Sequence, residues 1–362
     1  MRMMIHKLTK VLPLLAVLAG GTQALAATKP IEVRVVVVTT FEVGKDTGDV
    51  PGEFQHWVER YPLTETLPFP MGNRPLRYNP EQHVLGIVTS MGKVHATASI
   101  MALAMDPRFD VSKAYWILAG IAGIDPAKGS IGSAVWAHYA VDGDLGFEID
   151  AREIPKDWET GNVPDGKATP FQKPVSKRDD DDGIEAYGLN AGLADWAYGL
   201  TAGMTLPDND KLKANRAKYT DHPAALKPPS VMVGDTLTAD RFWVGGLMTK
   251  WAEKWVPYWT EDKGVFVTSA EEDVGYLQAL TYLSKIHKVD FSRALDLRTA
   301  SDFTIPPPNM TAADFLATEA SGSGYGAFTE AVEAAYLVGG KVVSEIATHW
   351  DKYADHVPAG PH

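Results

Sequence analysis

Short apolar runs alternate along the chain with longer stretches of helical periodicity. The apolar runs predict buried strands over residues 31–40, 83–89, 114–118, 134–141, 231–233, 265–268 and 295–297. The periodic stretches predict helices over residues 94–105, 190–204, 240–256 and 327–349, and another helix that ends near residue 286. This alternation is typical of an α/β protein whose sheet is covered by helices on both faces. Ligands of such folds bind beyond the carboxyl ends of the strands, so the residues that follow the strands are the first candidates for a site.

Residues 151–230 break this alternation. They are polar and rich in proline, and they contain the acidic run DDDD at 179–182. We interpret this stretch as a surface insertion with one helix, at 190–204. A calcium site at the acidic run is the alternative, but the spacing of an EF-hand is missing, so the pattern favours a solvated loop.

The first 26 residues have the three-part pattern of a secretory signal peptide. Basic residues precede an apolar stretch at 11–20, and Ala24 and Ala26 have the spacing of a cleavage site. About ten apolar residues are too few for a membrane span, which takes roughly 20. We therefore expect a signal peptide at 1–26, a single domain at 27–362 that contains the insertion, and a bacterial periplasmic or secreted location. No later stretch is apolar and long enough to predict a transmembrane segment in the mature chain.

The charge balance of the chain is acidic. It has 34 Lys and Arg residues against 46 Asp and Glu residues, a formal net charge of −12. The predicted signal carries three of the basic residues and no acidic one, so the mature count is 31 against 46, or −15. Proteins bind nucleic acid mainly through Lys and Arg that neutralise phosphates, so a nucleic-acid partner is excluded. The absence of cysteine excludes disulfides, a thiolate nucleophile and Cys-ligated metal centres.

Four acidic residues stand where a predicted strand gives way to a loop: Glu42, Asp235, Glu272 and Asp302. Carboxylates just past strand ends line the ligand crevice of open α/β sheets. Each of them could instead cap a helix, because the free N–H groups and the dipole at a helix start stabilise an acidic side chain. The sequence leaves both interpretations open for each residue, and it does not tell whether the four converge.

Several common chemistries lack their motif in this chain. The glycines at 119–123 have only a GxxG spacing, no Walker sequence occurs, and the glycine-rich stretch 321–326 follows a helical pattern, so a nucleotide cofactor is disfavoured. No HExxH motif is present, so no metal is expected. No GxSxG motif is present either, which disfavours a serine nucleophile of the α/β-hydrolase type.

Five short motifs follow one another at the predicted strand ends: residues 90–96 (SMGKVHA), 118–123 (LAGIAG), 234–235 (GD), 271–275 (EEDVG) and 298–302 (RTASD). In order and spacing they resemble motifs of the purine nucleoside phosphorylase and nucleosidase superfamily. Longer blocks, at 38–57, 234–243, 268–275 and 297–303, resemble those of the purine nucleoside permease family, a divergent branch of that superfamily. The resemblance covers nearly the whole mature chain. It implies a nucleoside phosphorylase-like α/β fold, with three αβα layers around a central mixed β-sheet, and a purine nucleoside as ligand.

The resemblance also implies catalytic roles. Asp302 would be the general acid that gives a proton to purine N7, which requires a raised pKa. Glu272 would accept hydrogen bonds from the ribose 2′- and 3′-hydroxyls while the sugar develops positive charge. Glu42 occupies the place of a water-activating glutamate.

Further residues are implied to bind the substrate. The implied set is Gly120, Ala122, Gly123, Asp235, Phe242 and Trp243, together with Glu272. The glycine turn would lie against ribose or an anion, and Asp235 precedes the base-binding region. Phe242 and Trp243 are candidates for stacking on the base, and packing of the predicted helix 240–256 is the alternative interpretation for both.

The chain departs from the superfamily's phosphorylases at the phosphate site. Those enzymes place an Arg in the early loop and a Ser or Thr in the glycine turn, where this chain has Lys45 and Ala122. Ser130 and Arg298 are the substitutes that the sequence offers. No cofactor is expected, and phosphate is a co-substrate only if the cleavage is phosphorolytic.

Two classes of function therefore stay open. One is an enzyme that cleaves the N-glycosidic bond of purine nucleosides with water or phosphate. The other is a periplasmic nucleoside-binding protein that serves uptake without turnover and works with an inner-membrane transporter. The resemblance also suggests a homo-oligomer, for which the Trp-rich stretch 240–256 is a candidate interface.

Overall fold

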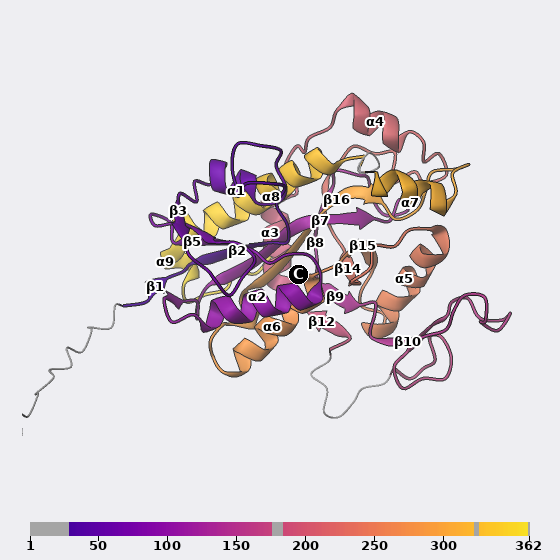
Figure 1. The fold of residues 1–362 in the computed structure, drawn as a ribbon, viewed down its shortest axis with the longest axis horizontal. Coiled ribbons are helices and arrows are strands. Elements are labelled where there is room, and N and C mark those ends of the chain that lie inside the picture. The colour runs from indigo at the N-terminus through magenta and orange to yellow at the C-terminus, as the bar shows by residue number, and fades with distance from the viewer. Residues whose placement is uncertain (1–28, 176–183, 322–325, 361–362) are drawn as a thin grey trace, which may run out of the picture.

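The computed structural model describes residues 29–175, 184–321 and 326–360. In these residues the chain forms a large mixed sheet between two layers of helices (Figure 1). The predicted signal peptide and the acidic run at 179–182 lie outside the described residues. No helix of the described part is both long and apolar enough to cross a membrane.

Strand β2 (Val35–Thr39) shows why the sheet has helices on both faces. Its four valines are fully buried, and successive side chains of a strand point to opposite faces. Val35 and Val37 accordingly join one hydrophobic core, whereas Val36 and Val38 join the other. A sheet whose two faces are both apolar must be covered by helices on each face, which gives the three layers expected from the sequence.

The main sheet is built from strands of both directions. Along its path the strands are β12 (Ala186–Gly188), β9 (Tyr139–Asp142), β14 (Asp235–Thr238), β15 (Phe266–Ala270), β7 (Tyr115–Ile124), β2, β5 (Val84–Val88), β4 (Leu76–Asn79) and β3 (Glu65–Leu67). Off this path, β16 (Ala294–Phe303) pairs with β7 and β8 (Ala134–Trp136), and β8 pairs with β13 (Val231–Val233). Two small sheets complete the set, β1 (Ile31–Glu32) with β6 (Phe109–Asp110) and β10 (Gly146–Glu148) with β11 (Asn162–Pro164).

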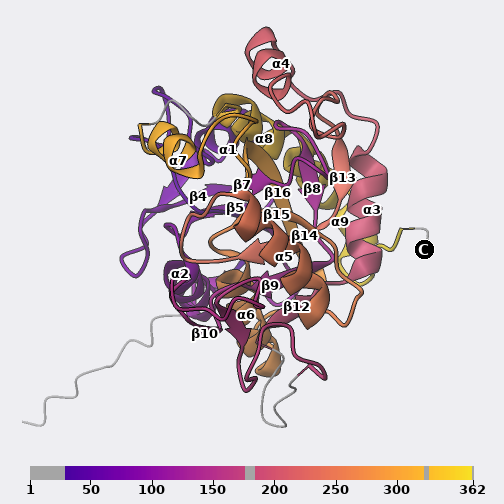
Figure 2. The same cartoon turned by 90° about the vertical axis from the view of Figure 1, so that its right-hand side faces the viewer.

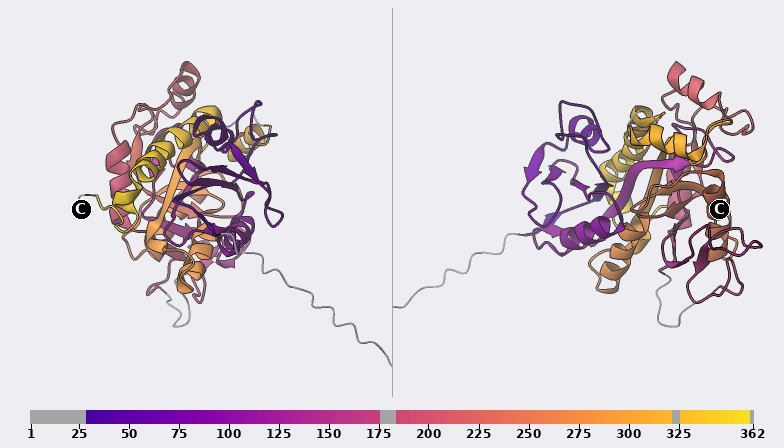
Figure 3. Two further views of the ribbon diagram at one scale, coloured as in Figure 1. Left: turned by 90° about the vertical axis from the view of Figure 1, so that its left-hand side faces the viewer. Right: turned by 45° about the vertical axis from the view of Figure 1, so that its right-hand side comes forward.

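The helices form one layer on each face of the sheet. Helices α1 (Gln55–Arg60), α3 (Ala191–Thr201) and α8 (Phe328–Thr348) contribute to the core that contains Val35 and Val37. Helices α2 (Lys93–Met105) and α6 (Asp273–Lys285) contribute to the opposite core. Figure 3 shows α8 and the α2–α6 pair on opposite sides of the long strand β16. The remaining helices are α4 (Asp210–Arg216), α5 (Gly246–Trp259), α7 (Ala312–Ala320), α9 (Trp350–Tyr353) and the 3-10 turn η1 (Phe291–Arg293).

The predicted insertion at 151–230 contains two kinds of structure. Strand β12 extends the main sheet by pairing with β9, and α3 lies in the first helix layer. Helix α4, in contrast, lies at the edge of the molecule (Figures 1 and 2). The domain boundaries themselves stay a prediction.

Two strands run much further than the sequence predicts. The predicted strand 114–118 is the first half of β7, and the predicted strand 295–297 is the start of β16, each ten residues long. The glycine-rich stretch that resembled a turn after residue 118 is therefore strand. Gly120 is required there by close packing, because a Cβ atom on it would lie 2.6 Å from Nη1 of Arg298 and 2.8 Å from Oε1 of Glu53.

Two other local predictions are wrong. The predicted strand 134–141 is divided into β8 and β9, which pair with different neighbours. Helix α5 begins at Gly246, so residues 240–245 form a loop and Asp240 does not cap that helix. Its Oδ1 atom instead accepts a hydrogen bond (2.7 Å) from the backbone N–H of Lys93 at the start of α2.

The functional region lies where two groups of parallel strands meet. Strands β2, β5, β7 and β16 run parallel, and β9, β14 and β15 form a second parallel group. The groups join through an antiparallel pairing of β7 with β15, in which Gly123 lies opposite Ser269. The carboxyl ends of β7 and β15 therefore approach each other from opposite directions, and the loops that follow the strands gather around one point.

Candidate functional site

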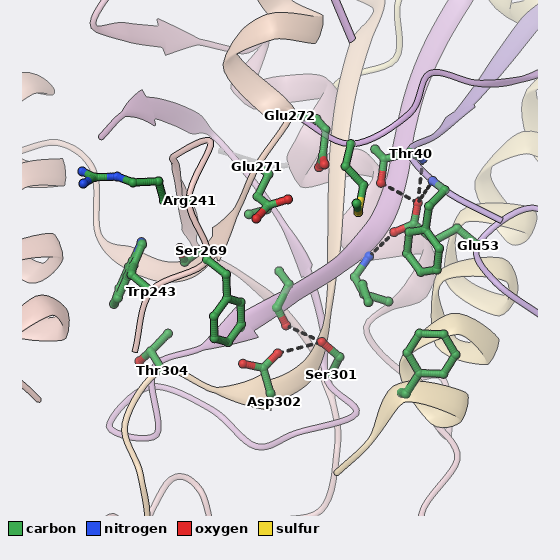
Figure 4. Close-up of a pocket in the computed structure, with 18 residues that line it drawn as sticks. Thr40, Glu53, Arg241, Trp243, Ser269, Glu271, Glu272, Ser301, Asp302 and Thr304 are labelled. Carbon is green, nitrogen blue, oxygen red and sulfur yellow. Dashed lines mark hydrogen bonds between the residues drawn. The ribbon is translucent and has the colours of Figure 1, made fainter. Parts of the chain in front are cut away.

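A cavity of about 400 Å³ opens at this junction of strand ends (Figure 4). Its wall comes from eight separate stretches of the sequence. The lining residues are Thr40, Phe41, Glu53, Met91, Ile121, Ala122, Gly123, Arg241, Phe242, Trp243, Ser269, Ala270, Glu271, Glu272, Ser301, Asp302, Thr304 and Phe328. The volume falls in the range of small-molecule sites, and the wall combines aromatic rings with four carboxyl groups.

Asp302 is the penultimate residue of β16 and lies in the cavity wall. It is almost fully buried, and burial raises its pKa to about 6. Ser301 donates the only hydrogen bond that its carboxyl receives from the described residues, at 2.8 Å. With so little support for the charged form, this carboxyl has the raised pKa that a proton donor near neutral pH requires.

Glu272 lies at the start of α6 and is held from two sides. Oε2 accepts a hydrogen bond from Nη2 of Arg298 at 2.9 Å, and Oε1 accepts one from the backbone N–H of Gly92 at 3.1 Å. Burial nevertheless raises the pKa of Glu272, although the positive charge of the Arg298 guanidinium lowers it. The carboxyl group is thus fixed in orientation beside the cavity.

Arg298 is the buried centre of a charged cluster beneath the cavity. Besides Glu272 it contacts Asp273 at 2.7 Å, and its Nη1 atom donates to the carbonyl of Ile121 at 3.1 Å. Asp296, fully buried nearby, has its pKa raised well above the usual range by burial and by the charge of Asp273. The guanidinium does not line the cavity, so the structure does not present Arg298 as a ligand for phosphate.

Glu53 is a cavity residue that the sequence reasoning missed. Its Oε1 atom accepts a hydrogen bond from the backbone N–H of Ile121 at 2.7 Å, and Oε2 accepts from the N–H (2.6 Å) and the hydroxyl (2.9 Å) of Thr40. Burial raises its pKa to about 7, although Arg298 and the hydrogen bonds lower it. No strand ends at Glu53. In the sequence, only its position eleven residues after Glu42 could have marked Glu53 as a candidate site residue.

Glu42 and Asp235 are turned away from the cavity. The carboxylate of Glu42 accepts hydrogen bonds from the backbone N–H groups of Val43, Gly52, Phe54 and Gln55, so it organises the loop that leads into α1. Asp235 starts strand β14, and its carboxylate accepts from the N–H groups of His138, Tyr139 and Val265. Neither residue lines the cavity, so the structure brings together only two of the four acids at strand ends.

The other predicted binding residues divide in the same way. Ala122 and Gly123 line the cavity, whereas Gly120 lies beneath it, against Arg298 and Glu53. Phe242 lines the cavity and is 40% exposed. Trp243 also lines the cavity, and its ring packs against Trp251 and Phe266 with centroids 6.1 Å away in both cases.

The cavity wall is rich in acidic residues and poor in basic ones. Four acidic residues line it, and burial raises the pKa of one of them, Glu271, to about 7. Among the described lining residues only Arg241 is basic, and its side chain is 60% exposed. Arg241 pairs with Glu148 at 3.3 Å and with Asp144 at 3.8 Å, and Figure 4 shows its guanidinium turned away from Glu271. The described residues contain no group of three or more His, Cys, Asp or Glu that could hold a metal ion.

Sequence comparisons identify relatives over most of the chain. A family model described as purine nucleoside permease matches residues 32–358. A purine nucleoside permease of Candida albicans is 29% identical over 269 residues, which cover 74% of this chain and 64% of that protein. A probable purine nucleoside permease of Schizosaccharomyces pombe is 32% identical over 279 residues, 75% of this chain and 78% of that protein. The chain thus spans less than two thirds of the length of the Candida relative.

Comparison with solved structures identifies the fold. The 5′-methylthioadenosine/S-adenosylhomocysteine nucleosidase of Helicobacter pylori has a TM-score of 0.52 at 12% identity, over 87% of this chain and 99% of that one. A putative nucleosidase of the same kind from Francisella philomiragia has a TM-score of 0.51 at 13% identity, over 85% and 98%. The expected nucleoside phosphorylase-like α/β architecture with a central mixed sheet is therefore confirmed.

Proposed function

The chain belongs to the purine nucleoside permease family, and we propose that it binds a purine nucleoside in the cavity and hydrolyses its N-glycosidic bond. One observation carries the proposal. Three buried carboxyl groups with raised pKa values, those of Glu53, Glu272 and Asp302, come from three separate segments and meet around one cavity. Buried acids with raised pKa values cluster at sites of proton transfer. Burying such a group lowers the stability of the protein, and the fold itself does not require these groups to be buried.

In the proposed reaction Asp302 is the acid. Its protonated carboxyl gives the proton to N7 of the purine as the bond between N9 and the ribose C1′ breaks, so that the bonding electron pair leaves on a neutral base. Glu272, held by Arg298 and Gly92, accepts hydrogen bonds from the ribose hydroxyls and stabilises the positive charge that develops on the sugar. Phe242 and Trp243 provide aromatic faces for the base.

Glu53 is the proposed base, in the role that the family resemblance implied for Glu42. A pKa of about 7 leaves a large fraction ionised at neutral pH, which suits a group that takes a proton from water as the water oxygen attacks C1′. Each carboxylate oxygen has two lone pairs, and Oε1 accepts only one hydrogen bond from the described residues. A water molecule can therefore bind to it without displacing the protein donors.

Two features support water over phosphate as the attacking group. Each nitrogen of the Arg298 guanidinium already donates a hydrogen bond within the protein, to Asp273, to the carbonyl of Ile121 or to Glu272. Arg241, on the rim, faces Asp144 and Glu148. A dianion such as phosphate would enter a cavity with four carboxyl groups and no inward-facing guanidinium among the described residues, which is electrostatically unfavourable.

The test is to incubate the purified protein with adenosine, inosine and guanosine, with and without phosphate. Liquid chromatography measures the free base, and the sugar product distinguishes ribose from ribose 1-phosphate. We expect base and ribose without phosphate. An Asp302→Asn preparation serves as the control for contaminating nucleosidases. Equal release by that variant, or no base in either buffer, would contradict the proposal, and release that requires phosphate would replace hydrolysis by phosphorolysis.

The names of the relatives support a second function, nucleoside capture in the service of uptake. In that case the predicted periplasmic location, a homo-oligomer and an inner-membrane transporter partner would belong to one system. The two functions separate in cells that lack the gene. Nucleoside uptake restored equally by the wild type and by Asp302→Asn would favour capture without turnover.

A further inference from the structure

Helix α2 begins two residues after Met91, a cavity residue, and its N-cap residue Gly92 has no side chain to bind the N–H groups at the helix start. Such groups need acceptors from elsewhere. Here the acceptors are carboxylates of two other segments. Glu272 accepts from the N–H of Gly92 at 3.1 Å, and Asp240 accepts from the N–H of Lys93 at 2.7 Å. The partial positive charge of the helix start stabilises both carboxylates.

The two carboxylates belong to separate segments of the cavity wall, and these segments have different proposed tasks (Figure 4). Glu272 is the proposed partner of the ribose hydroxyls. Asp240 is the first residue of the loop 240–245 before α5, in which Phe242 and Trp243 are the proposed aromatic faces for the base. The start of α2 therefore joins the part of the wall that binds the ribose to the part that binds the base.

A group of ion pairs holds Asp240 in this position. The N–H of Asp240 donates to Oδ2 of Asp144 at 2.6 Å, and the same oxygen lies 2.9 Å from Nζ of Lys93. Lys93 also donates to both carboxylate oxygens of Asp142, at 3.1 and 3.0 Å. Burial lowers the pKa of Lys93, but the charges of the two aspartates and the hydrogen bonds to them raise it above its ordinary value, so the ammonium group keeps its charge. The side chains of Lys93 and Asp144 are 16% and 23% exposed, so solvent screens this pair less than a surface pair.

The close approach of Asp240 to α2 depends on the glycine at position 92. Gly92 has a φ of +89°, which favours glycine, and a Cβ atom on it would lie 3.2 Å from Oδ1 of Asp240. The motif at 90–96 therefore has a structural reason in this chain: it starts a helix whose first N–H groups face the carboxylates of two neighbouring segments.

We propose that Asp240 is a positioning residue for nucleoside binding, which fixes the loop 240–245 to the same helix start that orients Glu272. The aromatic faces for the base and the carboxylate for the ribose are then held at a set separation. A nucleoside contacts both without first ordering the loop, so less binding free energy is lost. The inference rests on the proposed function, because it takes the base to lie against Phe242 and Trp243 and the ribose to lie at Glu272.

The first test needs no nucleoside. Amide hydrogen exchange is measured by mass spectrometry for the wild type, Asp240→Ala and Asn209→Ala. Asn209 is the matched control, because its side chain accepts from the N–H of Leu212 at the start of α4, at the edge of the molecule. We expect Asp240→Ala to speed exchange by about tenfold in peptides that cover 90–97 and 239–246, and Asn209→Ala to do so only in α4. Unchanged exchange in either peptide of Asp240→Ala, or faster exchange over the whole chain, would refute the link.

The second test measures binding in the Asp302→Asn protein, so that the nucleoside is not consumed. Calorimetric titration uses whichever of adenosine, inosine and guanosine binds most tightly, and its 2′-deoxy form. Adding Asp240→Ala should raise the nucleoside dissociation constant by about tenfold, the contribution of one stacked base. Asp240→Asn keeps an acceptor for the helix start, so it should stay within about twofold of the parent protein, as should Asn209→Ala. The preference for the nucleoside over its 2′-deoxy form should not change, because Glu272 keeps its own hydrogen bonds.

The outcomes separate this inference from the proposed function. If nucleosides are neither bound nor cleaved, the proposed function fails, and hydrogen exchange still decides whether Asp240 fixes the loop to α2. If nucleosides bind and Asp240→Ala binds them as tightly as its parent, only the positioning role is refuted. Equal weakening by Asp240→Asn, or a lost preference for the 2′-hydroxyl, would also contradict it, because the first would mean that the hydrogen bond to α2 is not decisive and the second that the whole site has collapsed.

Discussion

Glu42 lies just after strand β2 and Asp302 is the penultimate residue of strand β16, yet their carboxyl groups have opposite surroundings. Glu42 accepts hydrogen bonds from the backbone N–H groups of three residues of the loop between β2 and α1 and of Gln55, the first residue of α1. Asp302 receives a single hydroxyl among the described residues and faces a cavity. The first arrangement satisfies a charged carboxylate and stabilises a loop. The surroundings of Asp302 disfavour the charged form of its carboxyl group, so the group keeps a proton that it can donate. Burial of an acidic side chain therefore points to function only when few hydrogen-bond donors stabilise its charge.

Glu53 lies between these extremes. It accepts backbone hydrogen bonds as Glu42 does, from Thr40 and Ile121, but it also lines the cavity and has a pKa raised to about 7. Its surroundings hold the carboxylate in place while burial keeps it basic. The comparison therefore predicts three different results for substitutions of three acids that look alike in the sequence.

The largest effect is expected for Asp302→Asn. An amide keeps the shape of the side chain and the hydrogen bond from Ser301, but it has no proton to give to the base. Turnover of purine nucleosides should fall by about 10³-fold, within the usual contribution of a general acid, while the nucleoside dissociation constant stays within about threefold. Steady-state kinetics and calorimetric titration measure the two quantities. Normal turnover would show that the unsupported carboxyl is not the acid.

A smaller effect separates Glu53→Gln from Glu42→Gln. Both amides lose an acceptor for backbone N–H groups, so each protein should be less stable by about 1–3 kcal/mol in urea denaturation. Only Glu53→Gln removes the proposed base, and its turnover per folded molecule should fall by about 10²-fold. Turnover lost in Glu42→Gln and kept in Glu53→Gln would reverse the assignment and return the role to Glu42.

The third prediction concerns the cost of the unsupported carboxyl. Because the pKa of Asp302 is about 6 in the folded protein and 3.8 as its ordinary value, the folded state binds more protons between these two values. Stability contributed by this group therefore falls as the pH rises through that window, and the loss is complete above about pH 6. Asp302→Asn has no such group, so at pH 7 it should be more stable than the wild type by about 1–3 kcal/mol.

Urea denaturation at several pH values checks this result. The difference between Asp302→Asn and the wild type should shrink on acidification and vanish below about pH 4, where the carboxyl is protonated in both states. A variant that is less stable than the wild type at pH 7 would mean that the carboxylate of Asp302 is supported after all.

Much of the fold could be predicted because periodicity reports burial. The β-branched run of β2, the Ala- and Met-rich stretch of α2 and the predicted helices at α6 and α8 identified elements that the structure contains with small shifts at their ends. The predictions were wrong where tertiary contacts decide. Residues 119–123 resemble a turn, but they continue strand β7, because the glycine at 120 makes room for Arg298 and Glu53.

The candidate site was predictable in part for a related reason. Glu272 follows strand β15 and Asp302 lies at the end of β16, so position along the chain made both of them candidates, and both line the cavity. Glu53 is in a loop, and only the loop's path brings it under Ile121. Glu42 is nearer to the strand, but its carboxylate is bound by the N–H groups of its own loop. Local sequence does not reveal which of two nearby glutamates a loop turns inward.

The smallest expected effect concerns the two aromatic residues of the loop before α5. Phe242 lines the cavity and is 40% exposed, whereas Trp243 lines the cavity and packs its ring against Trp251 and Phe266. Phe242→Ala should weaken nucleoside binding by about tenfold, which is the contribution of stacking by one base. Trp243→Ala should lower both binding and stability, because it also removes core contacts. Equilibrium dialysis and urea denaturation measure these effects. Normal binding by Phe242→Ala together with weak binding by Trp243→Ala would place the base against Trp243 alone, so that one wall of the cavity would serve both the core and the ligand.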